Sequence, residues 1–342
     1  MSDATRATAR ELVAPAKGIL AADESSGTIK RRFDQIEVES TEESRRLYRQ
    51  LLFTTPGLGD HISGVILFDE TIRQGADDGT PFVKILERAG VIPGIKVDTG
   101  AKPLALHPDE TVTEGLDGLR ERLGEYKDLG ARFAKWRATI IIGDGTPTDF
   151  AIHANAHAMA RYAALCQDAG IVPIVEPEIL MDGDHDIAAC EAATGHTLAQ
   201  LYEQMAAHRI ELPGTLLKVN MILPGKAAAV QSSDVDVAEA TIRCLTEHVP
   251  AEVPGVVFLS GGMSDEEATS RLNEMNKIRA ARGGSSWELS FSYGRALQHP
   301  SLSAWKGEPA NVEAAQRALA HRALMNGLAR SGTYSADMET AA

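Results

Sequence analysis

Eight charged side chains lie inside or at the ends of apolar, β-branched segments where buried strands are expected. Four are cations and four are anions: Lys96, Lys135, Arg137, Lys218, Asp23, Asp98, Glu176 and Glu178. Strands covered on both faces are normally almost continuously apolar, and burying an unpaired charge costs several kcal/mol. The equal numbers of opposite charges allow the cluster to neutralise itself in one shared interior.

Charged and apolar residues alternate along these segments. Lys218 and Asn220 share one face of their segment, while Leu217 and Val219 share the other, because successive strand side chains point to opposite faces. The three preceding segments show the same alternation. The apolar sets must face covering helices, so we expect the charged sets, Asn220 included, to face the interior. The alternative is that the charges only fill the interior as pairs or extend to solvent at the strand ends.

Three lysines in one interior favour nucleophilic catalysis. An amine attacks only when it is neutral, and both burial and a neighbouring cation lower the pKa of a lysine. Its product with a ketone is an iminium ion, an electron sink that permits cleavage of a neighbouring carbon–carbon bond. The carboxylates would then transfer protons. The pattern does not choose among Lys96, Lys135 and Lys218.

Two glycine-containing loops follow the last two apolar segments and have the features of a phosphate site. They are Ser260-Gly261-Gly262 and Ser292-Tyr293-Gly294-Arg295. Glycine allows backbone N–H groups to approach phosphate oxygens, and loops after the seventh and eighth strands of a barrel commonly bind phosphate. One Gly-Gly pair is more often a simple turn, but two such loops, one with an arginine, favour phosphate binding.

The elements that must position these residues are apolar segments separated by stretches of helical period. The segments begin near Gly18, Gly64, Ile92, Phe133, Ile171, Thr215, Gly255 and Glu288. Eight strand–helix units with right-handed crossovers are the number that closes a barrel. We therefore expect one α/β domain over residues 1–342, a single (β/α)8 TIM barrel. An open doubly wound sheet is the alternative, but no glycine-rich dinucleotide fingerprint follows an early strand.

The surplus length is expected to form N- and C-terminal helical extensions and one long loop. The helices are predicted over Ala4–Val13 and Asn311–Arg330, and the loop over Gln74–Pro81. Residues 331–342 are small and polar, which predicts a mobile tail.

Local signals mark several helix boundaries. Ser40 with Glu43 and Ser264 with Glu267 fit the capping box at a helix start. Gly170 follows an alanine-rich helical run and is a good helix stop.

Composition limits the possible partners and compartment. The formal net charge of -14 argues against a general nucleic-acid binder, so an anionic substrate needs a local cluster of cations. No apolar run approaches the ~20 residues of a membrane helix. Cys166, Cys190 and Cys244 are too far apart for a metal motif and fit a reducing compartment. We expect a soluble, cytoplasmic protein with no nucleic-acid or membrane partner.

Two segments could suggest a metal, and both have a simpler explanation. His153 and His157 have i, i+4 spacing but lie in an alanine-rich helix without a nearby acidic partner, so we interpret them as surface residues. Asp182–Asp186 lacks the twelve-residue calcium-ligand pattern and is expected to be a solvated loop. We therefore expect no metal and no cofactor.

Seven segments, in order, closely resemble class I fructose-bisphosphate aldolases. They are GILAADES (18–25), GIKVD (94–98), FAKWR (133–137), VEPEIL (175–180), GTLLK (214–218), FLSGG (258–262) and FSYGRAL (291–297), and the resemblance extends from about Glu11 to Tyr334. It implies a barrel that reversibly cleaves fructose 1,6-bisphosphate into dihydroxyacetone phosphate and glyceraldehyde 3-phosphate through a lysine imine. It also implies a homotetramer, and no metal.

The resemblance assigns roles to five of the charged residues. Lys218 is the expected Schiff-base lysine, and Glu176, with Lys135 beside it, is the expected general acid and base. Asp23 resembles the residue that handles the C4 hydroxyl proton, and Glu178 supports the lysine network.

The resemblance also implies a substrate-binding set. One phosphate is expected at Ser260, Gly261, Gly262, Ser292, Gly294 and Arg295, and the other end of the substrate at Arg32, Lys96 and Arg137, assisted by Ser25 and Thr28. Vertebrate members of the family end in a tyrosine used in proton exchange, whereas the last tyrosine here is Tyr334. The resemblance therefore does not identify the group that protonates the enamine, nor the preference among bisphosphate, monophosphate and seven-carbon sugars.

The sequence leaves two alternative functions open. A transaldolase-like barrel would also form an imine but would need one phosphate site rather than two. A non-catalytic barrel would be expected to have lost the lysine or its carboxylate partner, and Lys218, Glu176 and Asp23 are all present.

Overall fold

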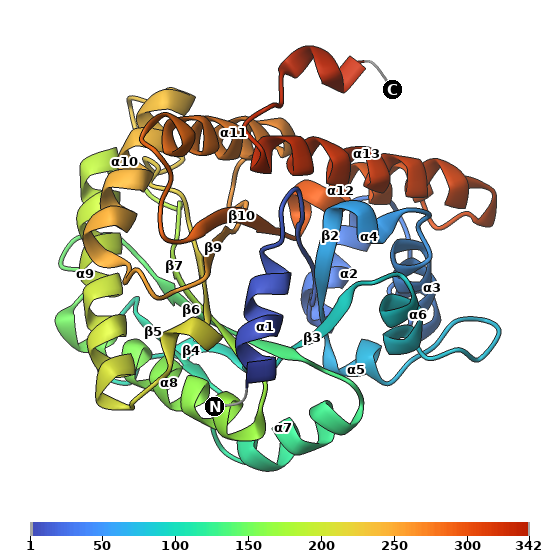
Figure 1. Cartoon of the computed structure of the whole chain (residues 1–342), viewed down its shortest axis with the longest axis horizontal. Coiled ribbons are helices and arrows are strands. Elements are labelled where there is room, and N and C mark those ends of the chain that lie inside the picture. Colours follow the sequence, from blue (N-terminus) through green and yellow to red (C-terminus); the bar gives the residue numbers. More distant parts are fainter. Residues whose placement is uncertain (1–2, 341–342) are drawn as a thin grey trace.

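The computed structural model describes residues 3–340, which form a closed barrel of eight parallel strands (Figure 1). The barrel strands are β1 (Gly18–Ala22), β2 (Ile62–Leu67), β3 (Ile92–Lys96), β6 (Phe133–Ile140), β7 (Val172–Ile179), β8 (Leu216–Val219), β9 (Gly255–Phe258) and β10 (Glu288–Tyr293). Each pairs with the next barrel strand along the chain, and β10 closes the ring on β1. The predicted (β/α)8 barrel is confirmed, and the open doubly wound sheet is wrong.

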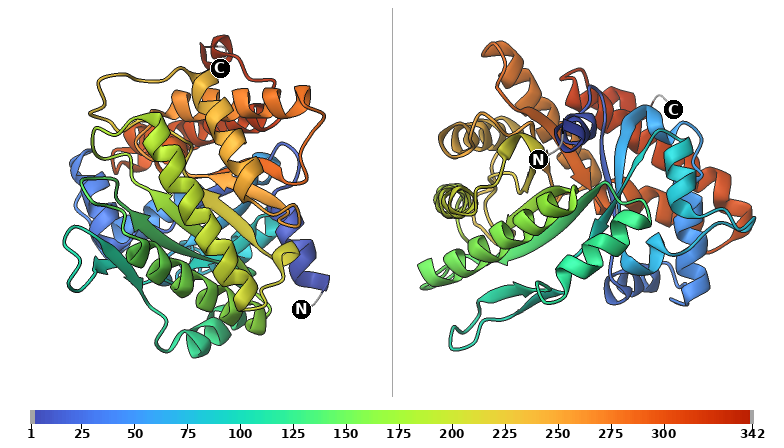
Figure 2. Two further views of the ribbon diagram at one scale, coloured as in Figure 1. Left: turned by 90° about the vertical axis from the view of Figure 1, so that its left-hand side faces the viewer. Right: turned by 60° about the horizontal axis from the view of Figure 1, so that its bottom comes forward.

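Helices surround the barrel and form the extensions at both ends of the chain (Figures 1 and 2). They are α1 (Asp3–Leu12), α2 (Ser26–Asp34), α3 (Glu42–Phe53), α4 (Leu58–His61), α5 (Asp69–Ile72), α6 (Phe82–Arg88), α7 (Leu119–Asp128), α8 (Asp149–Ala169), α9 (Ile187–Ala207), α10 (Asp234–His248), α11 (Asp265–Ala281), α12 (Arg295–Trp305) and α13 (Val312–Arg330), with short 3-10 turns at Leu212–Gly214, Pro309–Asn311 and Ala336–Thr340. The predicted terminal helices correspond to α1 and α13, and α13 packs across α11 and α12.

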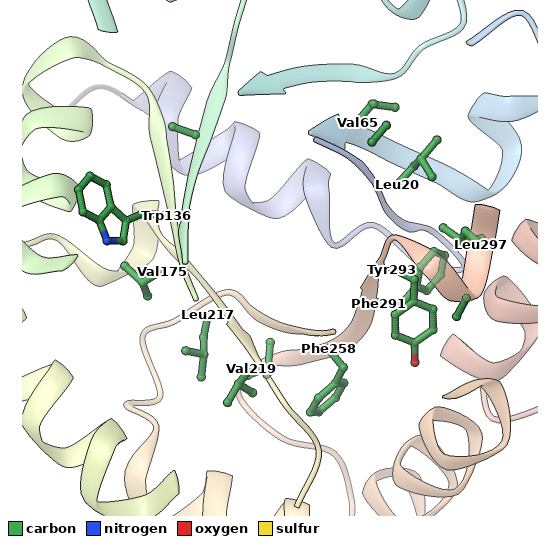
Figure 3. Close-up of a cluster of buried hydrophobic side chains, with 14 of the residues drawn as sticks. Leu20, Val65, Trp136, Val175, Leu217, Val219, Phe258, Phe291, Tyr293 and Leu297 are labelled. Atoms are coloured by element: carbon green, nitrogen blue, oxygen red, sulfur yellow. The ribbon is translucent and has the colours of Figure 1, made fainter. Parts of the chain in front are cut away.

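The apolar strand faces pack against the helices, as the alternation predicts. Figure 3 shows Trp136, Val175 and Leu217 within this buried layer. The Trp136 ring stacks on Tyr162 of α8 with 5.5 Å between ring centroids. Strand side chains at these positions are removed from water, which supplies most of the favourable free energy of folding.

A second apolar cluster fills the N-terminal half of the barrel interior. It consists of inward-facing strand residues, one face of α1 and the residue that follows this helix: Ala9, Leu12, Val13, Ile19, Ala21, Ile66, Phe133, Val172, Ile174, Leu216 and Val257. Thus α1 closes the bottom of the barrel, and the charged residues are confined to the other end of the interior.

Two of the three predicted helix boundaries are confirmed. Ser264 and Glu267 form the capping box of α11, and Gly170 ends α8 in the left-handed conformation. The Ser40–Glu43 prediction is wrong by one residue, because Thr41 is the N-cap of α3 and exchanges hydrogen bonds with Ser44. A serine at the third helical position therefore completes the capping box here.

The antiparallel hairpin of β4 (Gly100–Pro103) and β5 (Thr111–Glu114) was not predicted. It lies beside β6 and α8 (Figure 2). Asn155 of α8 accepts a 3.1 Å hydrogen bond from the Thr113 amide of β5. Its strands are too short and polar to give an alternating apolar pattern.

The segment after α13 makes defined contacts. Tyr334 is buried and donates a 2.9 Å hydrogen bond to Glu339, whose carboxylate also binds His321 and Arg322. Residues 341–342 lie outside those described, and mobility of residues 331–342 stays a prediction.

Replacement of Gly94 by alanine is expected to destabilise the protein by about 1–3 kcal/mol, because it overpacks the barrel interior. A Cβ atom at Gly94 would lie 2.3 Å from the Phe133 ring. Gly124→Ala in α7 is the matched control: a Cβ there meets nothing within 4 Å, and alanine stabilises a helix by about 0.5–1 kcal/mol relative to glycine. Urea unfolding of both variants measures whether the free energy of unfolding falls in Gly94→Ala and rises in Gly124→Ala. Equal changes in the two variants would contradict the packing argument.

Candidate active site

A cavity of ≈ 370 Å³ opens at the carboxyl ends of the barrel strands. Fifteen of the sixteen residues expected in the site line it, and the one that does not is Gly262. Additional lining residues are Ala21, Glu24, Asp98, Gly100, Ala101, Thr139 and Leu259. The carboxyl end is where barrel enzymes place their catalytic groups.

Lys135 joins two carboxylates at the floor of the cavity. Its Nζ lies 2.8 Å from Oδ2 of Asp23 and 3.2 Å from Oε2 of Glu176. The other oxygen of Glu176, Oε1, lies 3.0 Å from Nζ of Lys218. Lys135, Glu176 and Lys218 are 3%, 3% and 4% exposed, so the chain of charges is almost fully removed from solvent. The register of β7 and β8 produces the last contact, because Val175 lies opposite Leu217.

The pKa values in this group are controlled by pairing rather than by burial. Burial acts to raise the pKa of Asp23 and Glu176, but the charges of Lys135 and Lys218 outweigh it and hold both below their usual values. Burial acts to lower the pKa of Lys135, but Asp23 and Glu176 outweigh it and raise the pKa above its usual value. For Lys135 the expected lowering by burial and neighbouring cations is therefore wrong, and the residue is held as an ammonium ion.

Two further ion pairs line the wall. Lys96 Nζ lies 2.8 Å from Oδ1 of Asp98, and Arg137 pairs with Glu178 on the adjacent strand. Burial acts to lower the pKa of Arg137, but Glu178 outweighs it and raises the pKa. These pairs confirm that the interior charges neutralise one another.

Two buried polar atoms in the cavity have no hydrogen-bond partner among the described residues: Ser292 Oγ and Glu176 Oε2. Lys135 makes an ion pair with that glutamate oxygen, but the contact does not have hydrogen-bond geometry. Such atoms are costly to bury unpaired, so each is available to a bound molecule. Ser292 is 1% exposed and lines the cavity, as do Ser260 and Gly261 of the other loop.

Arg295 connects the two glycine-containing loops. Its guanidinium donates to the carbonyl oxygens of Gly261, at 3.1 Å, and Met263. The arginine therefore lies beside Gly261, and it lines the cavity together with Ser260 and Ser292.

The cavity lining also contains Glu24, a residue that the sequence did not predict. Glu24 is buried and its carboxylate accepts hydrogen bonds from Arg32, Arg49 at 2.6 Å and Gln298 at 2.8 Å. Burial acts to raise the pKa of Glu24, but the two arginines outweigh it and lower the pKa. A carboxylate next to Asp23 was the available signal, but its partners are remote in the sequence.

The structure corrects two expected positions. The Gly262 amide donates a 3.2 Å hydrogen bond to the sulfur of Met181 and lies outside the cavity lining. Asn220 does not face the interior: β8 ends at Val219, and the Asn220 amide donates to Thr194 of α9 and accepts from the Ile179 amide. The alternation of inward and outward side chains ends with the last residue of the strand, so it does not apply to Asn220. Tyr334 also does not line the cavity.

The segments weighed as metal sites have other roles. His153 and His157 are exposed, and Asp186 caps α9. Between Asp3 and Thr340, no group of three or more His, Cys, Asp or Glu side chains is arranged to hold a metal ion. Within the same part of the chain, no helix is long and apolar enough to cross a membrane.

Comparisons with known proteins agree on one family. The family model described as "Fructose-bisphosphate aldolase class-I" matches residues 5–342. A "Probable fructose-bisphosphate aldolase class 1" from Xanthomonas campestris pv. campestris is 55% identical, covering 96% of this chain and 97% of its own length. "Fructose-bisphosphate aldolase 6, cytosolic" from Arabidopsis thaliana is 52% identical, covering 98% and 95%. A solved Plasmodium falciparum aldolase, in complex with TRAP and a small-molecule inhibitor, superimposes with a TM-score of 0.95 at 47% identity, covering 97% and 95%.

Lys135→Met is expected to destabilise the fold at pH 7 by about 3–5 kcal/mol, because it leaves buried Asp23 and Glu176 without their shared cation. Both carboxylates have depressed pKa values, so in the wild type their contribution is present above about pH 4 and is lost as the pH falls below it. In the variant, fewer cations oppose the effect of burial, so the pKa values of the two carboxylates rise. Acidification from pH 7 to pH 4 then stabilises the folded variant, and the difference in free energy of unfolding between wild type and variant becomes smaller.

Urea unfolding at several pH values measures this difference. Lys84→Met, which removes an exposed lysine paired with Glu87, is the control and is expected to change stability little at any pH. If the loss of unfolding free energy caused by Lys135→Met stays constant from pH 7 to pH 4, the carboxylates are not coupled to Lys135.

Proposed function

The chain belongs to the class I fructose-bisphosphate aldolase family, and from this premise we propose that it cleaves fructose 1,6-bisphosphate reversibly, with Lys218 as its Schiff-base residue. The products are dihydroxyacetone phosphate and glyceraldehyde 3-phosphate. The observation that carries the proposal is a buried lysine amine 3.0 Å from the Glu176 carboxylate, at the floor of a cavity lined by cations. A nucleophile within hydrogen-bond reach of its base is the general signature of covalent catalysis.

The ion pairs favour Lys218 over the other two lysines. Lys135 contacts two carboxylates, and Lys96 contacts both the carboxylate and the carbonyl oxygen of Asp98. Among the described residues, Lys218 has one ion-pair partner, Glu176. Transfer of a single proton to Glu176 therefore frees the Lys218 amine without separating it from a second anion.

Imine formation begins when the Lys218 amine, after giving a proton to Glu176, attacks the C2 carbonyl of the sugar. Glu176 then returns a proton so that the carbinolamine hydroxyl leaves as water. Its second oxygen, which lacks a hydrogen-bond partner, can accept from that hydroxyl or from the water. Lys135 stays charged and holds the carboxylate in place.

Carbon–carbon cleavage needs a base for the C4 hydroxyl, and we assign it to Asp23. The hydroxyl proton moves to the carboxylate, the C4–O bond becomes a carbonyl, and the C3–C4 electron pair moves into the iminium to form an enamine. The lowered pKa of Asp23 keeps it ionised before the step. Arg137 and Glu178 support the neighbouring wall as a bonded pair.

The cavity lining contains enough cations for two phosphates. We assign one phosphate to Ser260, Gly261, Ser292, Gly294 and Arg295, and the other to Ser25, Thr28, Arg32, Lys96 and Arg137. Two such sets favour a bisphosphate over the single phosphate of a transaldolase-like substrate.

We also propose the finer properties that membership implies. The reaction is metal-independent and serves glycolysis and gluconeogenesis, and the protein is cytoplasmic, as the name of the Arabidopsis relative says of that protein. The expected assembly is a homotetramer. These statements rest on family membership.

Borohydride added together with fructose 1,6-bisphosphate is expected to inactivate the protein, because it reduces the imine to a stable secondary amine on Lys218. Peptide mapping by mass spectrometry locates the adduct. A chelator is expected to leave activity unchanged. Lys218→Ala should lose both turnover and the adduct, whereas Lys84→Ala, at an exposed lysine outside the cavity, should keep both. Chelator sensitivity without borohydride inactivation would eliminate the imine mechanism.

Ser292→Ala is expected to raise the KM for the bisphosphate about ten- to hundredfold, because a hydrogen bond to a charged group contributes about 1.5–3 kcal/mol. Stability should change little, since the hydroxyl has no partner among residues 3–340. Ser290→Ala, on the same strand, is the control: it removes a 2.7 Å bond to the Lys17 carbonyl, costs about 1 kcal/mol of stability and leaves KM unchanged. Steady-state kinetics and urea unfolding separate the two. An unaltered KM in Ser292→Ala would remove that hydroxyl from the phosphate site.

A further inference from the structure

The side chain of Met181, in the loop between β7 and α9, supports the phosphate loop Ser260-Gly261-Gly262. Its sulfur accepts a 3.2 Å hydrogen bond from the Gly262 amide. A Cβ atom at Gly261 would lie 3.0 Å from the same sulfur, so the thioether packs directly against both glycines. The backbone of Met181 is fixed as well, because its carbonyl accepts a 2.8 Å bond from the Lys226 amide. The loop that places Ser260 and Gly261 in the cavity lining is thus held by contacts with the Met181 thioether.

Met181 is also accessible to small oxidants. Of the methionines among residues 3–340, all except Met181 and Met338 are buried. The three cysteines are buried, and burial raises the pKa of each thiol, so the reactive thiolate is disfavoured. Met181, which is only partly buried, is therefore more open to oxidation than any thiol of the chain.

We propose that Met181 is a redox-sensitive positioning residue: its oxidation to the sulfoxide by a peroxide displaces the Ser260-Gly261-Gly262 loop and weakens phosphate binding. The sulfur lone pair attacks one peroxide oxygen and the O–O bond breaks. The released hydroxide then takes the proton of the new sulfur-bound hydroxyl, which leaves the sulfoxide and water. A methionine sulfoxide reductase reverses the change. The inference rests on the proposed function of this loop as a phosphate site.

The geometry explains why the loop must move. An N–H···O hydrogen bond alone needs about 2.9 Å between nitrogen and oxygen. An oxygen attached to the Met181 sulfur cannot fit between that sulfur and the Gly262 nitrogen, which are 3.2 Å apart. The amide must either retreat to bind the new oxygen or lose its acceptor. Retreat of the amide carries Gly261 with it because the two residues share a peptide bond, and loss of the acceptor removes the contact that holds the loop against Met181.

Treatment of the protein with hydrogen peroxide, followed by peptide mapping and steady-state kinetics, tests the proposal. The expected result is one added oxygen on the Met181 peptide and a rise in KM for fructose 1,6-bisphosphate of about ten- to hundredfold, as for loss of one hydrogen bond to a charged group. The change in kcat should be much smaller. Reduction by methionine sulfoxide reductases should restore KM. The affinity for inorganic phosphate, measured by calorimetry, should fall in parallel and does not depend on turnover.

Two variants serve as the test and its control. Met181→Leu, a volume-conserving change that cannot form a sulfoxide, should show the same KM before and after peroxide. Met338→Leu retains Met181 and should lose affinity as the wild type does. An unmodified Met181 peptide, or a fully oxidised one with unchanged KM and phosphate affinity, would overturn the proposal. An untreated wild type that binds phosphate but does not cleave the bisphosphate would instead contradict the proposed function.

Discussion

The ion pairs of Lys135 with Asp23 and Glu176 are the interaction on which the site depends. Each member of the group is buried at a cost that only the other members offset, so none could be placed there alone. The three residues come from β6, from the end of β1 and from β7, which are not all neighbours in the sheet. The bonds across the interior therefore fix the relative positions of strands that do not pair with one another. Lys218 joins the group through Glu176 and is positioned by it.

The division of the barrel interior into two halves makes this polar group tolerable. Phe133, Ile174 and Leu216 precede Lys135, Glu176 and Lys218 by two residues on the same strands and the same faces. Each of these strands thus places one apolar side chain in the cluster that fills the N-terminal half of the barrel, which we call the apolar plug, and one charged side chain in the cavity. The dry packing below removes the charges from water, and the cavity above leaves one side of each open to a ligand. Since ionic contacts strengthen as the local dielectric falls, the plug also strengthens the bonds that hold the site together.

Strand periodicity explains which parts of the site were predictable from the sequence. The inward set of Lys96, Lys135, Glu176 and Lys218 follows from a period of two, which is a local property of a strand. The prediction that Asn220 faces the interior failed because the strand ends one residue earlier, and no sequence signal marked that end. Glu24 was missed because its partners, Arg49 and Gln298, are 25 and 274 residues away, and only the closed barrel brings them together. The raised pKa of Lys135 likewise required three-dimensional pairing, since a list of charges cannot show which cation contacts which anion. The eight-strand barrel was predictable because its strands and helices each have their own period, whereas the short polar β4–β5 hairpin has none.

The charge of the cavity differs in sign from that of the whole chain. The lining contains six cations, Arg32, Lys96, Lys135, Arg137, Lys218 and Arg295, and five anions, Asp23, Glu24, Asp98, Glu176 and Glu178, a balance of +1 in a protein whose formal net charge is -14. Arg49 adds a further positive charge directly behind Glu24. Because Arg49 is buried and does not line the cavity, it would continue to neutralise Glu24 if the proposed phosphate competed for Arg32. A carboxylate shared by two arginines can release one of them without becoming an unpaired buried charge, and this arrangement reconciles a stable empty cavity with affinity for an anionic substrate.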